Sequence, residues 1–318
     1  MGIDTIVIDA GARYGLHPSW SELRGLVEFH LFELDEEEAA RLKLKYQNDA
    51  RITVHPIGLF NSDTELQLNV TAHRALNSVF SVDEKLLQRN DYFVRDFAIA
   101  GERRVPVRSI DSFFSGRDVH FLKLDTEGAE YEILKGAVGV LGSTVLGVRS
   151  EVLFAPIYKD APLFGEIHRL MLDCGFELLN LDYTGAGNKA GRFTLPGRYG
   201  KLINSDAVWV VNNDRLFSRH STRLLHDVVR FAVFLLNNGA SDLAVDTLVR
   251  AVTQAGVSFA EIKDDPLFRA LHKKMLLLFK SLLGLPMLLE SEITSTYRTI
   301  FGADFPLMNK FYEDRLFE

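Results

Sequence analysis

The amino-acid sequence predicts an α/β fold with a parallel sheet, a β-rich insertion and a C-terminal region of helices. Residues 5–8 are β-branched and almost all apolar, without alternation, which is typical of a strand buried on both faces of a parallel sheet. Strand-like and helix-like segments then alternate along the chain, as in α/β proteins. Near Asp214 the composition changes, and only helical spacing follows.

The first strand runs into a loop of small residues. Asp9 closes the strand, and Gly11 and Gly15 follow it. A buried strand, a glycine-rich turn and a helix commonly bind a nucleotide-like cofactor, because glycine lets the backbone approach a ligand and ligands collect at the carboxyl ends of such strands. The same glycines would also suit a turn that needs only positive φ, so this stretch alone leaves both interpretations open.

The following segments extend the pattern to β-α-β-α-β. We expect a second strand over residues 27–34, a charged amphipathic helix over residues 36–49 and a third strand over residues 51–60. This order implies parallel strands joined by right-handed crossovers.

Residues 61–108, approximately, interrupt this alternation. Residues 64–70 alternate as in a strand with one solvated face, and residues 103–110 alternate again. Pro106 favours an edge strand, because proline cannot donate a hydrogen bond to a neighbour. We interpret this region as a β-rich insertion.

The α/β pattern then resumes. Residues 119–125, VHFLKLD, predict a buried strand, a helix begins near Glu127, and the next strand ends at Glu151. A helix closed by Gly175 follows, as glycine often stands after a helix end. The last two strands are joined by a glycine-rich loop over residues 184–200, which predicts an antiparallel hairpin at the sheet edge.

We therefore expect one domain over residues 1–214 and a helical annex over residues 215–318. Within the annex, Gly239, Gly256 and Gly284 stand where helix C-caps are expected. Its apolar helices predict packing against the first domain, a second subunit or a protein partner. An interfacial membrane helix is the alternative, but the lysines do not form a large basic face.

Composition limits the classes of function. The net charge of −7 argues against nucleic acid as the main partner, and no apolar run is long enough for a transmembrane span. The single cysteine, Cys174, excludes an internal disulfide and fits a reducing compartment. With no targeting signal recognised at the N-terminus, we expect a cytoplasmic protein.

Several segments are characteristic in combination. They are IDAGARYG at residues 8–15, LFELDEEEAARL at residues 31–42, VRSIDSFFSGRDVHFLKLDTEGAEYEILKGA at residues 107–137, VRSEV at residues 148–152 and LMLDCGFELL at residues 170–179. Together they resemble the FkbM family of S-adenosylmethionine (SAM)-dependent methyltransferases. The LKLDTEGAEYEILKGA segment is the specific part of this resemblance, which covers residues 4–184 and extends toward residue 213.

The resemblance implies a Rossmann-like class I methyltransferase sheet with strand order 3-2-1-4-5-7-6, in which strand seven is antiparallel. It implies SAM as the cofactor and an O-methyltransferase that acts on a small-molecule or glycan acceptor, at a hydroxyl of a sugar or a secondary metabolite.

The alternative from another class is a non-catalytic, methyltransferase-like binding or scaffold module that recruits partners through the annex. Arg13, where the family usually carries asparagine, and the lack of a helix before the first strand support it. A nicotinamide-dependent oxidoreductase is disfavoured, because its Gly-x-Gly-x-x-Gly loop would need glycine at position 13.

The resemblance also assigns cofactor-binding residues. Asp9 and Gly11 would lie against the methionine part of SAM, and Gly15 would allow close packing of helix and strand. Glu33, at the end of the second strand, would accept hydrogen bonds from the ribose hydroxyls, with Asp35 as a weaker alternative. The structural alternatives are a turn cap for Asp9 and a helix-dipole charge for Glu33.

Asp125, Glu127 and Glu151 are the candidate catalytic residues. Methyl transfer mainly requires alignment of the acceptor, and a hydroxyl also needs a group that takes its proton. Asp125 or Glu127 could be that base or could hold the acceptor, and Glu151 is a further candidate for acceptor contact. No metal is expected, because the spacing shows no His-x-x-x-His or similar pairing.

Three other residues receive secondary interpretations. Lys123 lies in a buried strand, where lysine is rare unless it is paired, and we expect it to pair with one of the acids. Glu130 is more readily an ordinary solvated helix charge than a functional group. His73, in the insertion, is the histidine most plausibly placed over the site.

Overall fold

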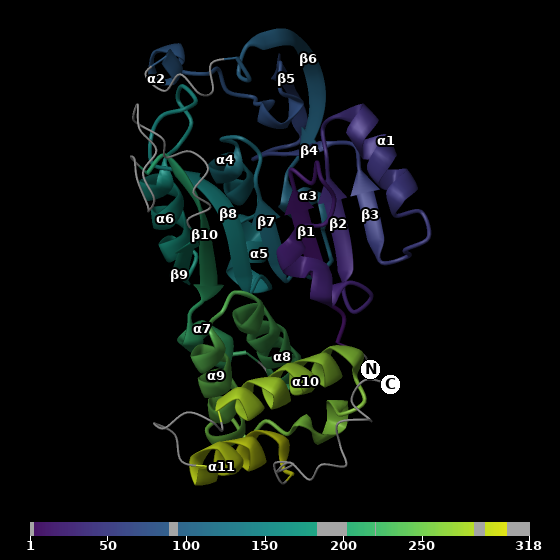
Figure 1. Cartoon of the computed structure of the whole chain (residues 1–318), viewed down its shortest axis with the longest axis vertical. Helices are drawn as coiled ribbons and strands as arrows, with labels where there is room; N and C mark the ends of the chain where they lie inside the picture. Colours follow the sequence, from purple (N-terminus) through teal and green to yellow (C-terminus); the bar gives the residue numbers. More distant parts are fainter. Residues whose placement is uncertain (1–2, 89–94, 183–201, 220, 283–289, 304–318) are drawn as a thin grey trace. The chain divides into compact units, whose positions relative to one another are not determined.

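The computed structural model describes residues 3–88, 95–182, 202–219, 221–282 and 290–303 (Figure 1). The chain divides into two compact units, one of residues 4–215 and one formed by Ile3 together with the residues from 216 onward. Within the described ranges, all strands belong to the first unit.

A seven-stranded sheet forms the centre of the first unit. Its strands are β1 (Ile6–Ala10), β2 (Glu28–Phe32), β3 (Ile52–His55), β7 (Phe121–Leu124), β8 (Gly147–Leu153), β9 (Phe176–Asp182) and β10 (Asn204–Val211), in the order β3-β2-β1-β7-β8-β10-β9. Numbered within this sheet alone, the order is 3-2-1-4-5-7-6, and β10 is antiparallel to both of its neighbours. The predicted fold class and strand order are confirmed.

The central strand of the sheet is fully buried. Every residue of β1 is buried, and Val7 and Ile8 have no exposed surface. β1 pairs in parallel with β2 on one side and β7 on the other, so its apolar run packs on both faces. The carboxyl ends of these three strands therefore meet at one edge of the sheet.

Most helices of the first unit connect its strands. They are η1 (Pro18–Leu23), α1 (Glu36–Lys45), α3 (Ile110–Phe113), α4 (Glu130–Lys135), α5 (Val138–Ser143) and α6 (Phe164–Asp173). The short helix α7 (Asn213–Phe217) follows the last strand and includes the boundary between the two units. The single helix expected from near Glu127 is instead two, α4 and α5. Gly136 stands between them, where a Cβ atom would lie only 2.2 Å from the carbonyl oxygen of Phe60, so only glycine allows this close approach.

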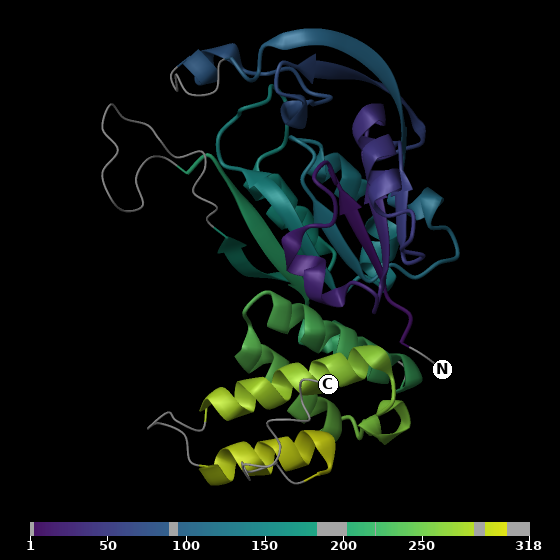
Figure 2. The ribbon, with the colours of Figure 1, turned by 45° about the vertical axis from the view of Figure 1, so that its right-hand side comes forward.

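The insertion forms a sheet of its own (Figure 2). Its elements are β4 (Gly58–Leu59), β5 (Thr64–Thr71), η2 (Arg74–Leu76), α2 (Glu84–Gln88) and β6 (Ile99–Arg108), with strand order β4-β6-β5. The expectation that Pro106 marks an edge strand is wrong, because β6 is the middle strand. Proline is tolerated there since the pairing of β6 with the short β4 begins only at Val107.

The annex contains α8 (Ser221–Asn237), α9 (Ser241–Thr253), η3 (Phe259–Ile262), α10 (Pro266–Leu282) and α11 (Glu290–Phe301). Inside it, the buried carboxylate of Asp227 pairs with Arg219 and Arg230. None of the helices in the part of the chain that the structure describes is both long and apolar enough to cross a membrane. The glycine-rich loop of residues 184–200 and the expected cap Gly284 lie outside the described residues.

Candidate functional site

The glycine loop crosses the edge of the sheet between the ends of β2 and β7. The Gly11 N–H donates to the carbonyl oxygen of Phe32 at 3.1 Å, and φ at Gly11 is +74°. A Cβ atom on Gly11 would lie 1.7 Å from the carbonyl oxygen of Asp125. The loop that follows β1 and the turn that follows β7 are therefore in direct backbone contact.

A buried ion chain links the ends of β1 and β7. The Lys123 ammonium lies 3.3 Å from Asp9 Oδ1 and 3.4 Å from Asp125 Oδ2, which confirms the expected pairing of Lys123 with an acid. Burial lowers the pKa of Lys123, but the charges of Asp9 and Asp125 raise it above its ordinary value. Lys123 thus carries a positive charge next to the exposed carboxylate of Asp125.

Asp9 does not face the cavity. Its side chain has no exposed surface, and Oδ2 accepts the N–H of His17 at 3.2 Å. The expected contact of the Asp9 carboxylate with the methionine part of SAM is therefore corrected: buried behind the loop, Asp9 holds Lys123 and the backbone at His17.

An open cavity lies between the sheet edge and the insertion. Gly11, Glu33, Asp125 and Glu127 line it with polar groups. Its apolar lining includes residues from the insertion sheet and the segments next to it: Ile57, Leu59, Phe60, Leu68, Val79 and Val107. A flat apolar group and a row of hydrogen-bonding groups can therefore be bound side by side.

Glu33 lies at the end of β2 as predicted. It is 7% exposed, and Oε1 accepts the N–H of Asp35 at 2.7 Å. Burial raises the pKa of Glu33 above its ordinary value. The carboxyl group is thus fixed at the cavity wall, where it can accept hydrogen bonds from a ligand.

Glu127 is held from two directions. Its backbone has φ of +58°, a left-handed conformation that is unusual for a residue other than glycine, and its carbonyl oxygen accepts the hydroxyl of Ser78 at 2.6 Å. Its Oε2 accepts the phenol of the buried Tyr158 at 2.5 Å. Burial, followed by the charge of Asp125, raises the pKa of Glu127 to about 8.

Glu151 completes a cluster of carboxyl groups. One oxygen each of Asp125, Glu127 and Glu151 lies within 4.8 Å of the others. Asn204 on β10 donates to Glu151 Oε1 at 2.8 Å, and burial, then the neighbouring acids, raise the pKa of Glu151 well above its ordinary value. Carboxylate oxygens at this spacing could also hold a hard divalent cation. The expectation that no metal is used stays a prediction.

Glu130 is not a solvated charge. It is 2% exposed, and its carboxylate accepts the N–H groups of Thr126 at 2.6 Å and Gly128 at 3.0 Å. The interpretation as an ordinary surface residue is wrong, because α4 begins at Glu130 and turns this side chain back into the preceding loop. Glu130 thereby shapes the turn that carries Glu127.

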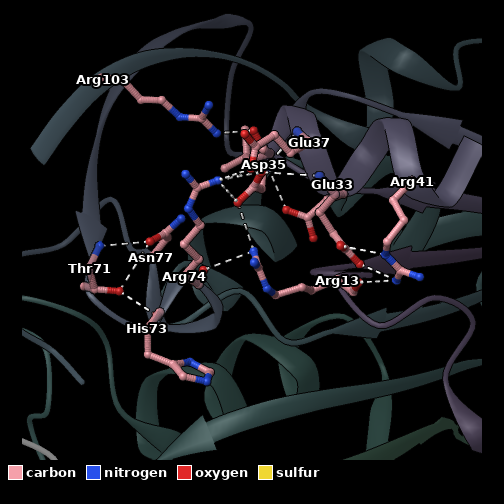
Figure 3. Close-up of polar contacts among 12 residues, drawn as sticks. Arg13, Glu33, Asp35, Glu37, Arg41, Thr71, His73, Arg74, Asn77 and Arg103 are labelled. Carbon is pink, nitrogen blue, oxygen red and sulfur yellow. Dashed lines mark hydrogen bonds and ion pairs between the residues drawn. The ribbon is translucent and has the colours of Figure 1, made fainter. Parts of the chain in front are cut away.

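Four candidates lie away from the cavity lining: Asp9 and Glu151, described above, and Gly15 and His73. A Cβ atom on Gly15 would meet the hydroxyl oxygen of Tyr46 at 2.5 Å, so Gly15 packs against the end of α1. His73 is exposed at the start of η2, and Figure 3 shows its ring pointing away from the acids around Asp35. Neither residue contributes a side chain to the cavity.

Sequence reasoning missed the residues that hold the acids. Ser78 lies in the insertion, Tyr158 in an irregular segment after β8, and Asn204 at the start of β10. The only signal in the sequence was the density of polar residues around 77–78. No periodicity or spacing marks the other two positions.

The fold and the site define the class of protein. The strand order with its antiparallel β10, the glycine loop against Asp125 and the acid at the end of β2 are together those of a class I SAM-dependent methyltransferase. The family model described as the methyltransferase FkbM domain matches residues 9–178. The chain belongs to the FkbM methyltransferase family, and its methyl donor is SAM.

Solved structures give distant similarities. The methyltransferase FkbM from Methylobacillus flagellatus is 17% identical with a TM-score of 0.39, over 66% of this chain and 44% of that one, so this chain spans less than half of its length. A TehB-like SAM-dependent methyltransferase from Corynebacterium glutamicum is 12% identical (TM-score 0.32, 65% and 80% covered). An rRNA methylase from Streptococcus thermophilus is 10% identical (TM-score 0.33, 66% and 89% covered). No curated protein matches the chain.

Proposed function

We propose that the protein transfers the methyl group of SAM to a hydroxyl oxygen of a sugar, a glycan or a secondary metabolite. The observation that carries this proposal is the cluster of Asp125, Glu127 and Glu151, of which Asp125 and Glu127 line the cavity together with Gly11. When bound, SAM supplies an electrophilic methyl group on a sulfonium. The residues of this chain must then align an acceptor oxygen and remove its proton.

The cavity lining fits the parts of the cofactor. In this proposal Glu33 accepts hydrogen bonds from the ribose hydroxyls, and the apolar wall with Leu68 and Val107 packs against the base. Gly11 lets the glycine loop pack directly on the Asp125 carbonyl, where a Cβ atom could not be accommodated, and in this proposal the loop backbone there lies against the methionine part. Asp9 acts through Lys123 and the backbone at His17, and Gly15 acts through the packing of the loop on Tyr46.

Glu127 is the proposed base. A group with a pKa of about 8 can accept a proton near neutral pH and is basic enough to assist its removal from a hydroxyl. Asp125, which pairs with Lys123, would hold the acceptor by hydrogen bonds together with Glu151. Of the two roles expected for these acids, Glu127 thus takes that of the base and Asp125 that of acceptor contact.

The chemistry of the cluster supports a hydroxylated acceptor. Its three carboxyl groups lie close together, and a carboxyl group can accept a hydrogen bond from a hydroxyl or, when protonated, donate one to it. The cluster therefore suits a polyhydroxylated molecule, which can make several such bonds at once. The cytoplasmic location and a partner for the annex stay predictions.

Titration with S-adenosylhomocysteine (SAH) tests the cofactor site, with NAD as the control ligand. We expect micromolar binding of SAH and none of NAD. The Glu33→Ala variant should bind SAH about tenfold or more weakly, because it loses hydrogen bonds to a charged acceptor. Unchanged SAH affinity in this variant would show that the ribose lies elsewhere.

Asp125→Asn tests the placement of the acceptor. The amide keeps the shape but loses the charge beside Lys123, so turnover on an acceptor found by screening should fall about tenfold while SAH affinity stays within about twofold. Full turnover by this variant would remove Asp125 from the mechanism. If SAH does not bind the wild-type protein at all, the scaffold alternative with partners on the annex becomes the better explanation.

A further inference from the structure

Asp35 is the centre of an ion cluster at the rim of the cavity (Figure 3). Its Oδ1 accepts the N–H groups of Glu37 and Glu38 at 3.2 and 3.3 Å and so caps the start of α1. Its Oδ2 accepts Nη1 of Arg13 at 3.1 Å and Nη1 of Arg74 at 3.2 Å. With 4% exposure, this carboxylate is nearly buried beneath two guanidinium groups.

The cluster joins three stretches that are distant in sequence. Arg13 comes from the glycine loop, Asp35 from the turn after β2, and Arg74 from η2 in the insertion. Arg13 also donates to the carbonyl oxygen of Arg74 at 3.3 Å. A second insertion residue, Arg103, donates to the carbonyl oxygen of Leu34, so the same turn holds the insertion at two points.

These contacts lie directly at the cavity. Arg13 and Arg74 line it together with Glu33. The N–H of Asp35 donates to Glu33 Oε1 at 2.7 Å. Asp35 therefore holds both guanidinium groups and also orients Glu33, the proposed acceptor of hydrogen bonds from the ribose. Burial alone would raise the pKa of Asp35, but the bonds from Arg13 and α1 and the charges of both arginines lower it below its ordinary value.

The arrangement explains Arg13. Its side chain points toward Asp35 and the insertion. The carboxylate of Asp35 therefore balances the charge of its guanidinium group. A cation at this position is therefore compatible with a positively charged cofactor in the cavity. Arg13, the residue that departs from the family pattern, thus links the glycine loop to the insertion.

We propose that Asp35, Arg13 and Arg74 form a closure over the nucleoside half of the cavity, so that the cofactor leaves only when this ion cluster opens. The proposal rests on the proposed function, because it takes SAM and SAH as the ligands of the cavity. The three residues are positioning residues: they act by holding the glycine loop, Glu33 and the insertion together around the ligand.

The rate of SAH dissociation from the full-length protein tests the closure. We expect Arg74→Ala and Arg13→Ala each to raise this rate about tenfold, since each removes a charge-assisted hydrogen bond to a buried carboxylate. The double variant should be only slightly faster than either single one, because both arginines act on the same oxygen. Arg169→Ala, which breaks an exposed ion pair with Asp173 on α6, is the matched control and should change nothing.

Asp35→Asn separates closure from helix capping. Asparagine still caps a helix, so the melting temperature of the ligand-free variant should stay close to that of the wild type. SAH dissociation should nevertheless accelerate about tenfold and lose part of its dependence on salt concentration, which a purely structural role of Asp35 would not predict.

The outcomes distinguish the two proposals. SAH binding by the wild type with unchanged dissociation in Arg74→Ala and Asp35→Asn would overturn the closure and leave the proposed function in place. Absence of SAH binding by the wild type would overturn both. Faster dissociation in the cluster variants, with the Arg169→Ala control unchanged, would establish the closure.

Discussion

Gly11→Ala should abolish SAH binding and destabilise the first unit by about 3 kcal/mol or more. The new Cβ atom would lie 1.7 Å from the carbonyl oxygen and 2.8 Å from the carbonyl carbon of Asp125. Both are backbone atoms, so no side-chain movement can relieve the overlap. The φ angle of +74° adds strain for any residue with a side chain. Calorimetric titration with SAH and thermal unfolding measure the two effects.

Gly116→Ala is the matched control. Gly116 has a φ of +77°, but nothing lies within 4 Å of the position of a new Cβ atom. This variant should therefore lose only about 1 kcal/mol, the strain of the left-handed conformation, and should keep its SAH affinity. Equal losses in both variants would mean that the contact between Gly11 and Asp125 is not the source of the effect.

Glu127→Gln should reduce turnover by about two orders of magnitude and remove its dependence on pH near 8. Because ionised Glu127 is the proposed base, the wild-type rate should rise with pH and level off above a pKa of about 8. Glutamine preserves the size of the side chain and can still accept the phenol of Tyr158. A rate profile measured from pH 6 to 9.5 checks this, and an unchanged profile in the variant would exclude Glu127 as the base.

The stability of the folded protein provides a second readout for Glu127 that needs no acceptor. Between its ordinary pKa of 4.5 and about 8, the folded protein holds a proton here that the unfolded chain has lost. The stability that this group contributes is therefore complete below pH 4.5 and is lost as the pH rises through 8. The Gln variant does not titrate, so it should gain stability relative to the wild type between pH 5 and 9 in denaturant unfolding.

The sheet and several acids could be predicted because they follow from local pattern and topology. The continuous apolar run of β1 requires a position in the middle of a parallel sheet, where both faces are buried. The carboxyl ends of parallel neighbouring strands must then meet at one edge. Glu33 and Asp125 directly follow β2 and β7, so their presence at that edge was implied by the strand boundaries. Whether the assigned roles are correct stays a prediction.

The rest depended on contacts that no local pattern records. The direction of Arg13 is decided by Arg74, which stands 61 residues later in the chain. The burial of Asp9 depends on how the loop folds back at His17. Glu130 lies in a segment that could have continued as a helix from Glu127, but the left-handed conformations of Glu127 and Gly128 delay the start of the helix.

The hydrogen bond from Ser78 to the Glu127 carbonyl has a consequence for how this enzyme could diversify. The insertion both walls the cavity and supports the backbone of the proposed base. In the proposed function, the same segment would therefore affect both the choice of acceptor and the rate of the reaction. Exchanging the insertion with that of a relative, in order to obtain a new acceptor, should yield an active chimera only if a hydroxyl is kept at position 78.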